Sequence, residues 1–280
     1  MNNQVSVLRI VCADEQGLVA QVTGILFKRH CNIIENDEFV DRENRRFFMR
    51  TTFEGKHENV DILNEVQAVL PQGALIQCRR QRKKKIVILA TKEAHCLGDL
   101  LIRATFDDLY ADILAVISNH NNLSEMTRQL GHKFHFVDHE GLEREEHEER
   151  IIQLIDEYSP DYLVMAKYMR ILSSRFVDRY TNRIINIHHS FLPAFVGANP
   201  YRQAYERGVK IIGATAHFAT ANLDEGPIIA QGTIPVSHAH SVTDMAGNGR
   251  DVEKQVLGRA LRLVFDDRVF AHGNQTVIFD

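Results

Sequence analysis

The spacing of apolar residues divides the chain into a front part and a rear part with different rhythms. In the front part, residues 5–12 alternate like a strand, and residues 17–30 place Leu18, Val22, Ile25 and Leu26 on one helical face. The same tests predict strands at 32–40, 46–53 and 73–78 and a helix at 59–70. The order βαββαβ within about 80 residues is typical of a ferredoxin-like domain.

The rear part carries continuous apolar runs instead of alternating ones. Such runs indicate strands that are buried on both faces of a parallel sheet. Helical segments such as 142–157 separate them, and strand–helix alternation predicts an open, mostly parallel, Rossmann-like α/β sheet. The runs lie at 86–90, 113–117, 134–137, 162–166 and 184–187.

A basic segment between the two parts predicts the domain boundary. Six of the seven residues from Arg79 to Lys85 are lysine or arginine, and such like charges repel and favour an exposed linker. A polyphosphate or nucleic-acid patch is the alternative, but no aromatic residues interleave the charges. We therefore expect a front domain at 1–79, a linker at 80–85 and a rear domain at 86–280.

Composition narrows the class of protein. The 280 residues carry a net charge of −4, which disfavours a general nucleic-acid binder. The sequence contains no run of 18 apolar residues, so no membrane span is predicted, and residues 1–7 do not resemble a signal peptide. The four cysteines form no CxxC pair, as expected of reduced thiols. These features predict a cytoplasmic protein without nucleic-acid or membrane partners.

Candidate chemistry lies where two predicted strands end. Asn186 and His188 are two residues apart on the strand at 183–187 and therefore point to one side. Asp224 follows the strand at 213–218. An asparagine amide can stabilise an oxyanion, a histidine can shuttle a proton, and an aspartate can orient that histidine. Spacing alone nevertheless favours a plainer interpretation, in which these polar residues hydrogen-bond to loops.

Four motifs favour the catalytic interpretation over this plainer one. They are Ala166-Lys167-Tyr168-Met169-Arg170-Ile171-Leu172, Asn186-Ile187-His188-His189-Ser190-Phe191-Leu192-Pro193, Gly213-Ala214-Thr215-Ala216-His217-Phe218 and Leu223-Asp224-Glu225-Gly226-Pro227-Ile228-Ile229. Together and in this order they resemble the signatures of the folate-dependent formyltransferases. His189 and the run from Arg250 to Lys254 resemble the branch that hydrolyses 10-formyltetrahydrofolate. The front part resembles an ACT domain, with a strand-to-helix turn at 14–18.

The resemblance implies roles for particular residues. Asn186, His188 and Asp224 would be the catalytic trio, and 10-formyltetrahydrofolate would be converted to formate and tetrahydrofolate in one-carbon metabolism and purine synthesis. His217 falls within a motif, as a substrate-binding residue or as a buried core histidine. No tightly bound cofactor and no metal are expected, although His132, His135 and His139 superficially resemble a metal-binding string. The pterin pocket would include Met169, Arg170, Ile171 and Leu172.

The acceptor of the formyl group is predicted from the loop that follows residues 86–90. In glycinamide-ribonucleotide transferases the corresponding loop is glycine-rich and cradles a phosphate. Here Gly98 is the only glycine between 91 and 98, and Glu93 adds negative charge. Water is therefore the expected acceptor. Transfer to an amine, or a non-catalytic folate or amino-acid sensor, remains the alternative.

Two further expectations concern the front domain and the last helix. An ACT-like domain implies a small amino-acid effector, such as glycine or methionine, and packing against another copy in a homo-oligomer. A role in oligomerisation alone is the alternative. Near the C-terminus, Gly247 and Gly249 are expected to delay or fray the terminal helix. By this resemblance the effector would bind at Asp14, Gln16, Gly17 and Asn32.

Overall fold

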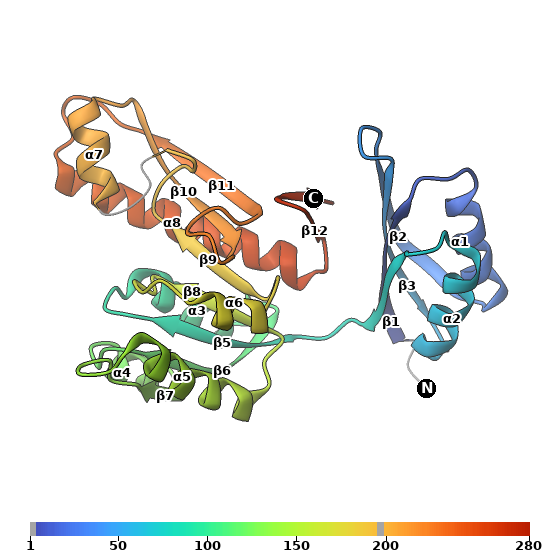
Figure 1. Ribbon diagram of the computed structural model, residues 1–280, viewed down its shortest axis with the longest axis horizontal. Helices are drawn as coiled ribbons and strands as arrows, with labels where there is room; N and C mark the ends of the chain where they lie inside the picture. The colour runs from blue at the N-terminus through green and yellow to red at the C-terminus, as the bar shows by residue number, and fades with distance from the viewer. Residues whose placement is uncertain (1–3, 195–198) are drawn as a thin grey trace. The chain divides into compact units, whose positions relative to one another are not determined.

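The computed structural model describes residues 4–194 and 199–280, which form two compact units (Figure 1). The first unit comprises the chain as far as Arg82 together with Asp266–Phe270 and Val277–Asp280. The second comprises Lys83–Phe265 and Ala271–Thr276. Among the described residues, no helix combines the length and the apolar character needed to cross a membrane.

The first unit contains the βαββαβ order that the sequence predicts. Its four strands form one antiparallel sheet in the order β2-β3-β1-β4. Apolar side chains from this sheet pack with Val22 of α1 and Ile62 of α2 in a single buried cluster. The elements are β1 (Gln4–Ala13), α1 (Leu18–Lys28), β2 (Asn32–Asp41), β3 (Arg46–Gly55), α2 (Asn59–Val69) and β4 (Leu75–Arg80).

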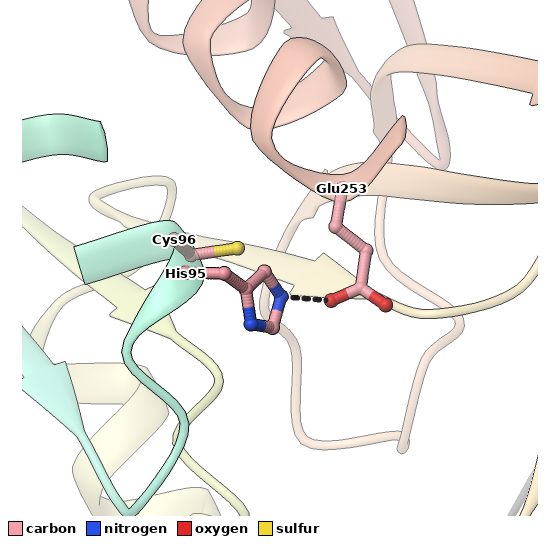
Figure 2. A group of neighbouring side chains, drawn as sticks. All are labelled: His95, Cys96 and Glu253. Atoms are coloured by element: carbon pink, nitrogen blue, oxygen red, sulfur yellow. Dashed lines mark hydrogen bonds and ion pairs between the residues drawn. The ribbon is translucent and has the colours of Figure 1, made fainter. Parts of the chain in front are cut away.

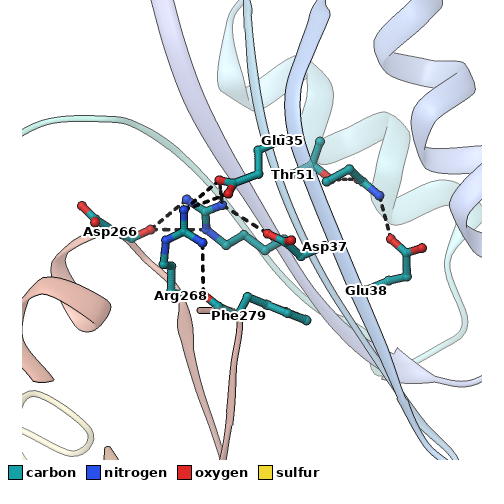
Figure 3. Close-up of polar contacts among 9 residues, drawn as sticks. Glu35, Asp37, Glu38, Thr51, Asp266, Arg268 and Phe279 are labelled. Atoms are coloured by element: carbon teal, nitrogen blue, oxygen red, sulfur yellow. Dashed lines mark hydrogen bonds and ion pairs between the residues drawn. The ribbon is translucent and has the colours of Figure 1, made fainter. Parts of the chain in front are cut away.

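The C-terminal residues of the first unit are held by polar contacts of charged side chains (Figure 3). Arg50 on β3 is buried, and its Nε and Nη2 donate hydrogen bonds of 3.3 and 3.1 Å to the carbonyl of Asp266. Its Nη1 pairs with Glu35, which also accepts a 2.8 Å hydrogen bond from Nη2 of Arg268. The apolar pattern could not indicate this attachment, because it depends on charged side chains and a backbone carbonyl.

The second unit is built on a seven-stranded sheet in the order β11-β10-β9-β8-β5-β6-β7. The five strands from β9 to β7 in this order run parallel, β10 is antiparallel to β9, and β11 is antiparallel to β10. The prediction of an open, mostly parallel α/β sheet is therefore confirmed. The strand order reverses between β5 and β8, where sheets of this kind usually bind ligands beyond the carboxyl ends of the strands.

The bounds of the second unit's elements agree closely with the apolar runs. The helices between the strands cover the sheet, and α8 packs along β9, β10 and β11. The elements are β5 (Lys84–Ala90), α3 (His95–Thr105), β6 (Ala111–Ser118), α4 (Ser124–Gln129), β7 (Phe134–Phe136), α5 (Arg144–Tyr158), β8 (Tyr162–Ala166), α6 (Ser174–Arg179), β9 (Ile184–His188), α7 (Pro200–Arg207), β10 (Ile211–Phe218), β11 (Ile228–Pro235) and α8 (Val242–Phe265). A two-stranded sheet of β12 (Val269–His272) and β13 (Gln275–Ile278) follows them.

Two local features differ from the sequence expectations. The basic segment is mostly structured, because β4 extends to Arg80, β5 begins at Lys84, and only residues 81–83 lie between them. The expectation that α8 starts late is wrong. The helix begins at Val242, ahead of Gly247 and Gly249, because tertiary packing of its apolar face outweighs the low helix propensity of glycine.

Candidate functional site

Two antiparallel strands bring the predicted catalytic residues together. β9 ends at His188, and its Asn186 lies opposite His217 in the register with β10. Asp224 lies in the loop between β10 and β11 and has a left-handed backbone, with φ of 57°. The structure therefore places Asn186, His188, His217 and Asp224 at one edge of the sheet.

Gly226 allows the loop that carries Asp224 to return closely to β10. The amide of Phe218 donates a 2.9 Å hydrogen bond to the carbonyl of Pro227. A Cβ atom on Gly226 would lie 1.8 Å from the carbonyl oxygen of Phe218, which is impossible without movement of the backbone. The glycine is thus required for the close approach that positions the Asp224 carboxylate.

The Asp224 carboxylate sets the protonation of His188. Nδ1 of His188 lies 3.2 Å from Oδ2 of Asp224, and both side chains are buried. Burial opposes ionisation of Asp224, but the hydrogen bond from Nδ1 of His188 outweighs it and holds the pKa of this carboxyl well below its ordinary value. Because an ionised carboxylate only accepts hydrogen bonds, Nδ1 must carry the proton. Nε2 of His188 is buried and has no hydrogen-bond partner among the residues that the structure describes.

His217 contacts both Asn186 and Asp224. Its Nδ1 donates a 3.0 Å hydrogen bond to the carbonyl of Phe218, so in the neutral ring Nε2 is an acceptor. Nε2 accepts a 3.2 Å hydrogen bond from Nδ2 of Asn186 and lies 3.7 Å from Oδ1 of Asp224. One N–H of Asn186 is thereby fixed, which orients the amide and its second N–H.

The loop after β8 combines exposed apolar residues with a partly buried arginine, as expected of a surface that binds a ligand. The side chains of Met169 and Ile171 are 57% and 56% exposed, which is unusual for large apolar residues beside a sheet edge. Arg170 is partly buried, whereas Leu172 is buried within a hydrophobic cluster and supports the loop from beneath. The amide of Met169 already donates a 3.1 Å hydrogen bond to Oγ1 of Thr91, so this amide is not free for a ligand.

A second polar cluster in the same unit was not predicted from the sequence. Oε2 of Glu253 on α8 accepts hydrogen bonds from His95, at 2.7 Å, and from Nζ of Lys167, at 3.2 Å. Its Oε1 accepts a 2.6 Å hydrogen bond from Tyr201. Glu93 lies 3.5 Å from Nδ1 of His95 and 4.0 Å from Lys167. We call His95, Lys167, Tyr201 and Glu253 the Glu253 network.

The Glu253 network is buried and strongly coupled. The exposed fractions of the Lys167 and Glu253 side chains are 4% and 1%. Burial raises the pKa of Glu253, but the hydrogen bond from His95 and the charge of Lys167 outweigh it and lower the pKa to about 2. Burial, together with the charge of Lys167, also lowers the pKa of His189 to about 4. His189 is therefore neutral at physiological pH.

Three neighbouring side chains of this region, His95, Cys96 and Glu253, are of the kinds that bind metals, and Figure 2 shows them with the hydrogen bond between His95 and Glu253. The ligand atoms of His95, Cys96 and Glu253 lie within 4.8 Å of one another. However, the Lys167 ammonium already neutralises Glu253, and burial raises the pKa of the Cys96 thiol far above its ordinary value. A thiol must lose its proton to bind a cation, so this arrangement fits the ion pair better than a metal.

The sequence held only a weak signal for the Glu253 network. Glu253 lies among Val252, Val256 and Leu257 on the buried face of α8, and a carboxylate within an apolar stripe normally has a charged partner. Its partner, Lys167, is 86 positions earlier in the chain and immediately follows β8. Only the fold brings the two side chains together.

The predicted effector positions lie at the surface of the first unit. Gly17 caps α1 with a left-handed φ of 89°, and Asp14 and Gln16 are exposed beside it. Nδ2 of Asn32 donates a 3.3 Å hydrogen bond to Glu54 on the neighbouring strand. This geometry leaves the proposed ligand positions accessible within the unit.

The chain is similar to known proteins over nearly its whole length. A family described as formyl transferase matches residues 84–261. A formyltetrahydrofolate deformylase of Escherichia coli strain K12 is 53% identical over 98% of both chains. The crystal structure of a formyltetrahydrofolate deformylase from Pseudomonas syringae has a TM-score of 0.95 and 38% identity, and covers 100% of this chain and 96% of that chain. A glycinamide ribonucleotide transformylase from Symbiobacterium toebii has a TM-score of 0.68 and 31% identity, covering 70% of this chain and 94% of its own.

The buried ion pair generates a stability prediction. We expect Glu253→Gln to destabilise the protein by about 3–5 kcal/mol at pH 7, because Lys167 would lose its buried partner. The double variant Lys167→Met with Glu253→Gln removes both charges and should recover most of this loss. Asp251→Asn on the exposed side of α8 is the matched control and should change stability by less than about 1 kcal/mol.

Urea unfolding across a range of pH measures these effects. The folded-state pKa of Glu253 lies below its ordinary value of 4.5, so its contribution is complete above that pH and is lost as pH falls toward 2. The double variant should therefore show a flatter loss of stability with acid than the wild type. Equal stability of Glu253→Gln and Asp251→Asn at pH 7 would contradict the assignment of a buried ion pair.

Proposed function

The chain belongs to the formyltetrahydrofolate deformylases, and from this premise we propose how its site hydrolyses 10-formyltetrahydrofolate to formate and tetrahydrofolate. One observation carries the proposal. Within the described parts of the chain Nε2 of His188 is buried without a hydrogen-bond partner while Nδ1 is held by Asp224, and the amide of Asn186 lies on the same strand. This combination offers a base and an oxyanion donor at one strand end.

Water is the nucleophile in the proposed reaction. Nε2 of His188 takes a proton from the water as its oxygen attacks the formyl carbon. The free N–H of Asn186 donates a hydrogen bond to the oxyanion that forms. The tetrahedral intermediate then collapses, the bond from the formyl carbon to the folate nitrogen breaks, and His188 returns the proton to that nitrogen.

Asp224 and His217 support the two reacting side chains. The negative charge of Asp224 stabilises the imidazolium form of His188 during the reaction. His217 acts through Asn186, because its hydrogen bond to Nδ2 directs the remaining amide N–H. We propose a positioning role for His217, in place of the direct substrate contact that the sequence comparison suggested as one option. None of these groups is a strong nucleophile, which favours direct hydrolysis over a covalent intermediate.

The loop from Met169 to Leu172 is proposed to hold the pterin. Exposed Met169 and Ile171 offer apolar contact to a flat ring, and Arg170 offers hydrogen-bond donors. Leu172 contributes through packing beneath the loop. The protein needs no tightly bound cofactor for this chemistry, because the folate is itself the substrate.

We also propose where the protein acts in the cell and what its first unit binds. We place the protein in the cytoplasm, where it would balance folate pools and supply formate for purine synthesis. The first unit would bind glycine or methionine near Asp14, Gln16, Gly17 and Asn32 and would pack against another copy in a homo-oligomer. The support is the βαββαβ fold and the accessible turn at Gly17.

Formate release without any acceptor tests the reaction and its residues. Wild-type protein incubated with 10-formyltetrahydrofolate alone should release one formate for each tetrahydrofolate formed. Asn186→Ala should lower kcat about 10²–10³-fold with little change in folate affinity, because the oxyanion donor is lost. Asp224→Asn should lower kcat about 10²-fold or more, because His188 loses its orientation and charge stabilisation.

The exposed neighbour Glu225 supplies the control for this assay. Glu225→Gln removes a carboxylate from the same loop and should leave kcat within about twofold. Absence of formate with wild-type protein would reject hydrolysis, and normal turnover by Asn186→Ala or Asp224→Asn would remove that residue from the mechanism.

Thermal unfolding with added amino acids tests the effector proposal. Glycine or methionine at saturating concentration should raise the Tm of the full-length protein, because a ligand that binds only the folded state stabilises it. Asp14→Ala should abolish the shift, whereas Glu15→Ala at the adjacent exposed position should retain it. If neither amino acid changes Tm or turnover, only the oligomerisation role remains.

A further inference from the structure

The side chains of the Glu253 network lie where the strand order of the large sheet reverses. β5 and β8 are neighbours in the sheet, with β6 beyond one and β9 beyond the other. The carboxyl ends of such strands normally border a ligand-binding crevice. Here Lys167 follows β8, Glu93 and His95 follow β5, and all three make contacts within the Glu253 network or to it.

The Glu253 network leaves no evident place for a substrate group. Both carboxylate oxygens of Glu253 are used, by His95 and Lys167 on one side and by Tyr201 on the other. Lys167 and Glu253 are almost completely buried and form an ion pair with each other. Their charges are therefore neutralised within the protein. The network therefore joins side chains from four separate segments of the second unit.

Two backbone features allow this arrangement. Lys167 adopts a left-handed conformation with φ of 62°, which is unfavourable for a residue with a Cβ atom. Gly249 on α8 lies directly beneath Tyr201, and a Cβ atom there would lie 2.0 Å from the hydroxyl oxygen. The glycine that weakens α8 locally is thus what lets Tyr201 reach Glu253. Unfavourable local choices that converge on one cluster are typical of functional sites.

An open cavity lies on the outer side of this cluster. It has a volume of about 650 Å³, and Glu93, His95 and Gly98 are among its lining residues, together with Arg250 and Lys254 of α8. Neither Asn186, His188 nor Asp224 lines it. His95 is therefore shared between the wall of this cavity and the Glu253 network.

We propose that the Glu253 network is a specificity determinant that closes the acceptor side of the formyl site, so that water but no amine substrate reaches the formyl carbon. This inference rests on the proposed hydrolysis at His188. The network is contiguous with that site through His189, whose ring lies 5.1 Å from the ring of His188 and 6.1 Å from that of Tyr201. His95 is the residue whose loss would join the outer cavity to the site.

If an amine could reach the formyl carbon, the same catalytic groups would transfer the formyl group to it. An amine nitrogen would attack the formyl carbon in place of water and form a new carbon–nitrogen bond. The bond to the folate nitrogen would break, and the proton released by the amine would pass through His188 to that nitrogen. The products would be a formamide and tetrahydrofolate, with no oxidant, reductant or further reactant required.

Partition of the formyl group between water and a small amine tests the proposal. Full-length protein is incubated with 10-formyltetrahydrofolate and glycinamide, and formate and N-formylglycinamide are both quantified. Wild type should give formate alone. His95→Ala should form N-formylglycinamide at a rate at least 10-fold above the wild-type background, and formate per tetrahydrofolate should fall below one by the fraction of formyl groups that the amine captures. This variant opens space but leaves Glu253 paired with Lys167 and Tyr201.

The control variant separates opened space from a lost hydrogen bond. His95→Gln keeps most of the side-chain volume and a donor for Glu253, so it should release only formate. Tyr201→Ala opens the network from α7 and provides a second test if His95→Ala does not fold. Water-only products from the folded variant would overturn the proposal while leaving hydrolysis intact. Wild-type protein that releases no formate would instead reject the proposed function.

Discussion

The proposed site depends on the contacts that the Asp224 carboxylate makes with His188 and His217. It lies 3.2 Å from His188 and 3.7 Å from His217, and so links the ends of β9 and β10 to the loop before β11. The antiparallel register places Asn186 opposite His217, and the bare Cα of Gly226 lets the loop return. A buried aspartate with two histidine neighbours remains ionised, and its charge then determines which nitrogen of His188 is free.

The second unit contains two buried carboxylates, Asp224 and Glu253, whose surroundings differ. Around Asp224 the ring nitrogen Nε2 of His188 has no partner among the described residues, which our proposal requires of a reacting group. Around Glu253 both carboxylate oxygens have partners, and the buried Lys167 neutralises the charge. In our proposal the first arrangement exchanges a proton and the second excludes an amine. The rings of His188, His189 and Tyr201 connect the two.

Local patterns were sufficient to predict the fold class. Alternation and apolar runs predicted both sheets, because these signals depend only on residues close in sequence. Two-residue spacing on a strand indicates that Asn186 and His188 point to one side, but their catalytic role is a prediction that rests on the family resemblance. Lys167 with Glu253, and Arg50 with Asp266, were missed because each pairing joins distant segments through the fold. The late start expected for α8 was wrong for a related reason, since packing that the sequence does not display stabilises the helix across Gly247 and Gly249.

The protonation of His188 tests this account most directly, because the mechanism requires Nδ1 to carry the proton and Nε2 to be free. Nitrogen-15 NMR of histidine-labelled protein at pH 7.5, assigned by comparison with His188→Gln, distinguishes the two ring nitrogens. We predict a protonated Nδ1 and an unprotonated Nε2 in the folate-free protein. Asp224→Asn should shift the balance between the two tautomers. A proton on Nε2 and none on Nδ1 in the wild type would contradict the proposed role of His188 as the base.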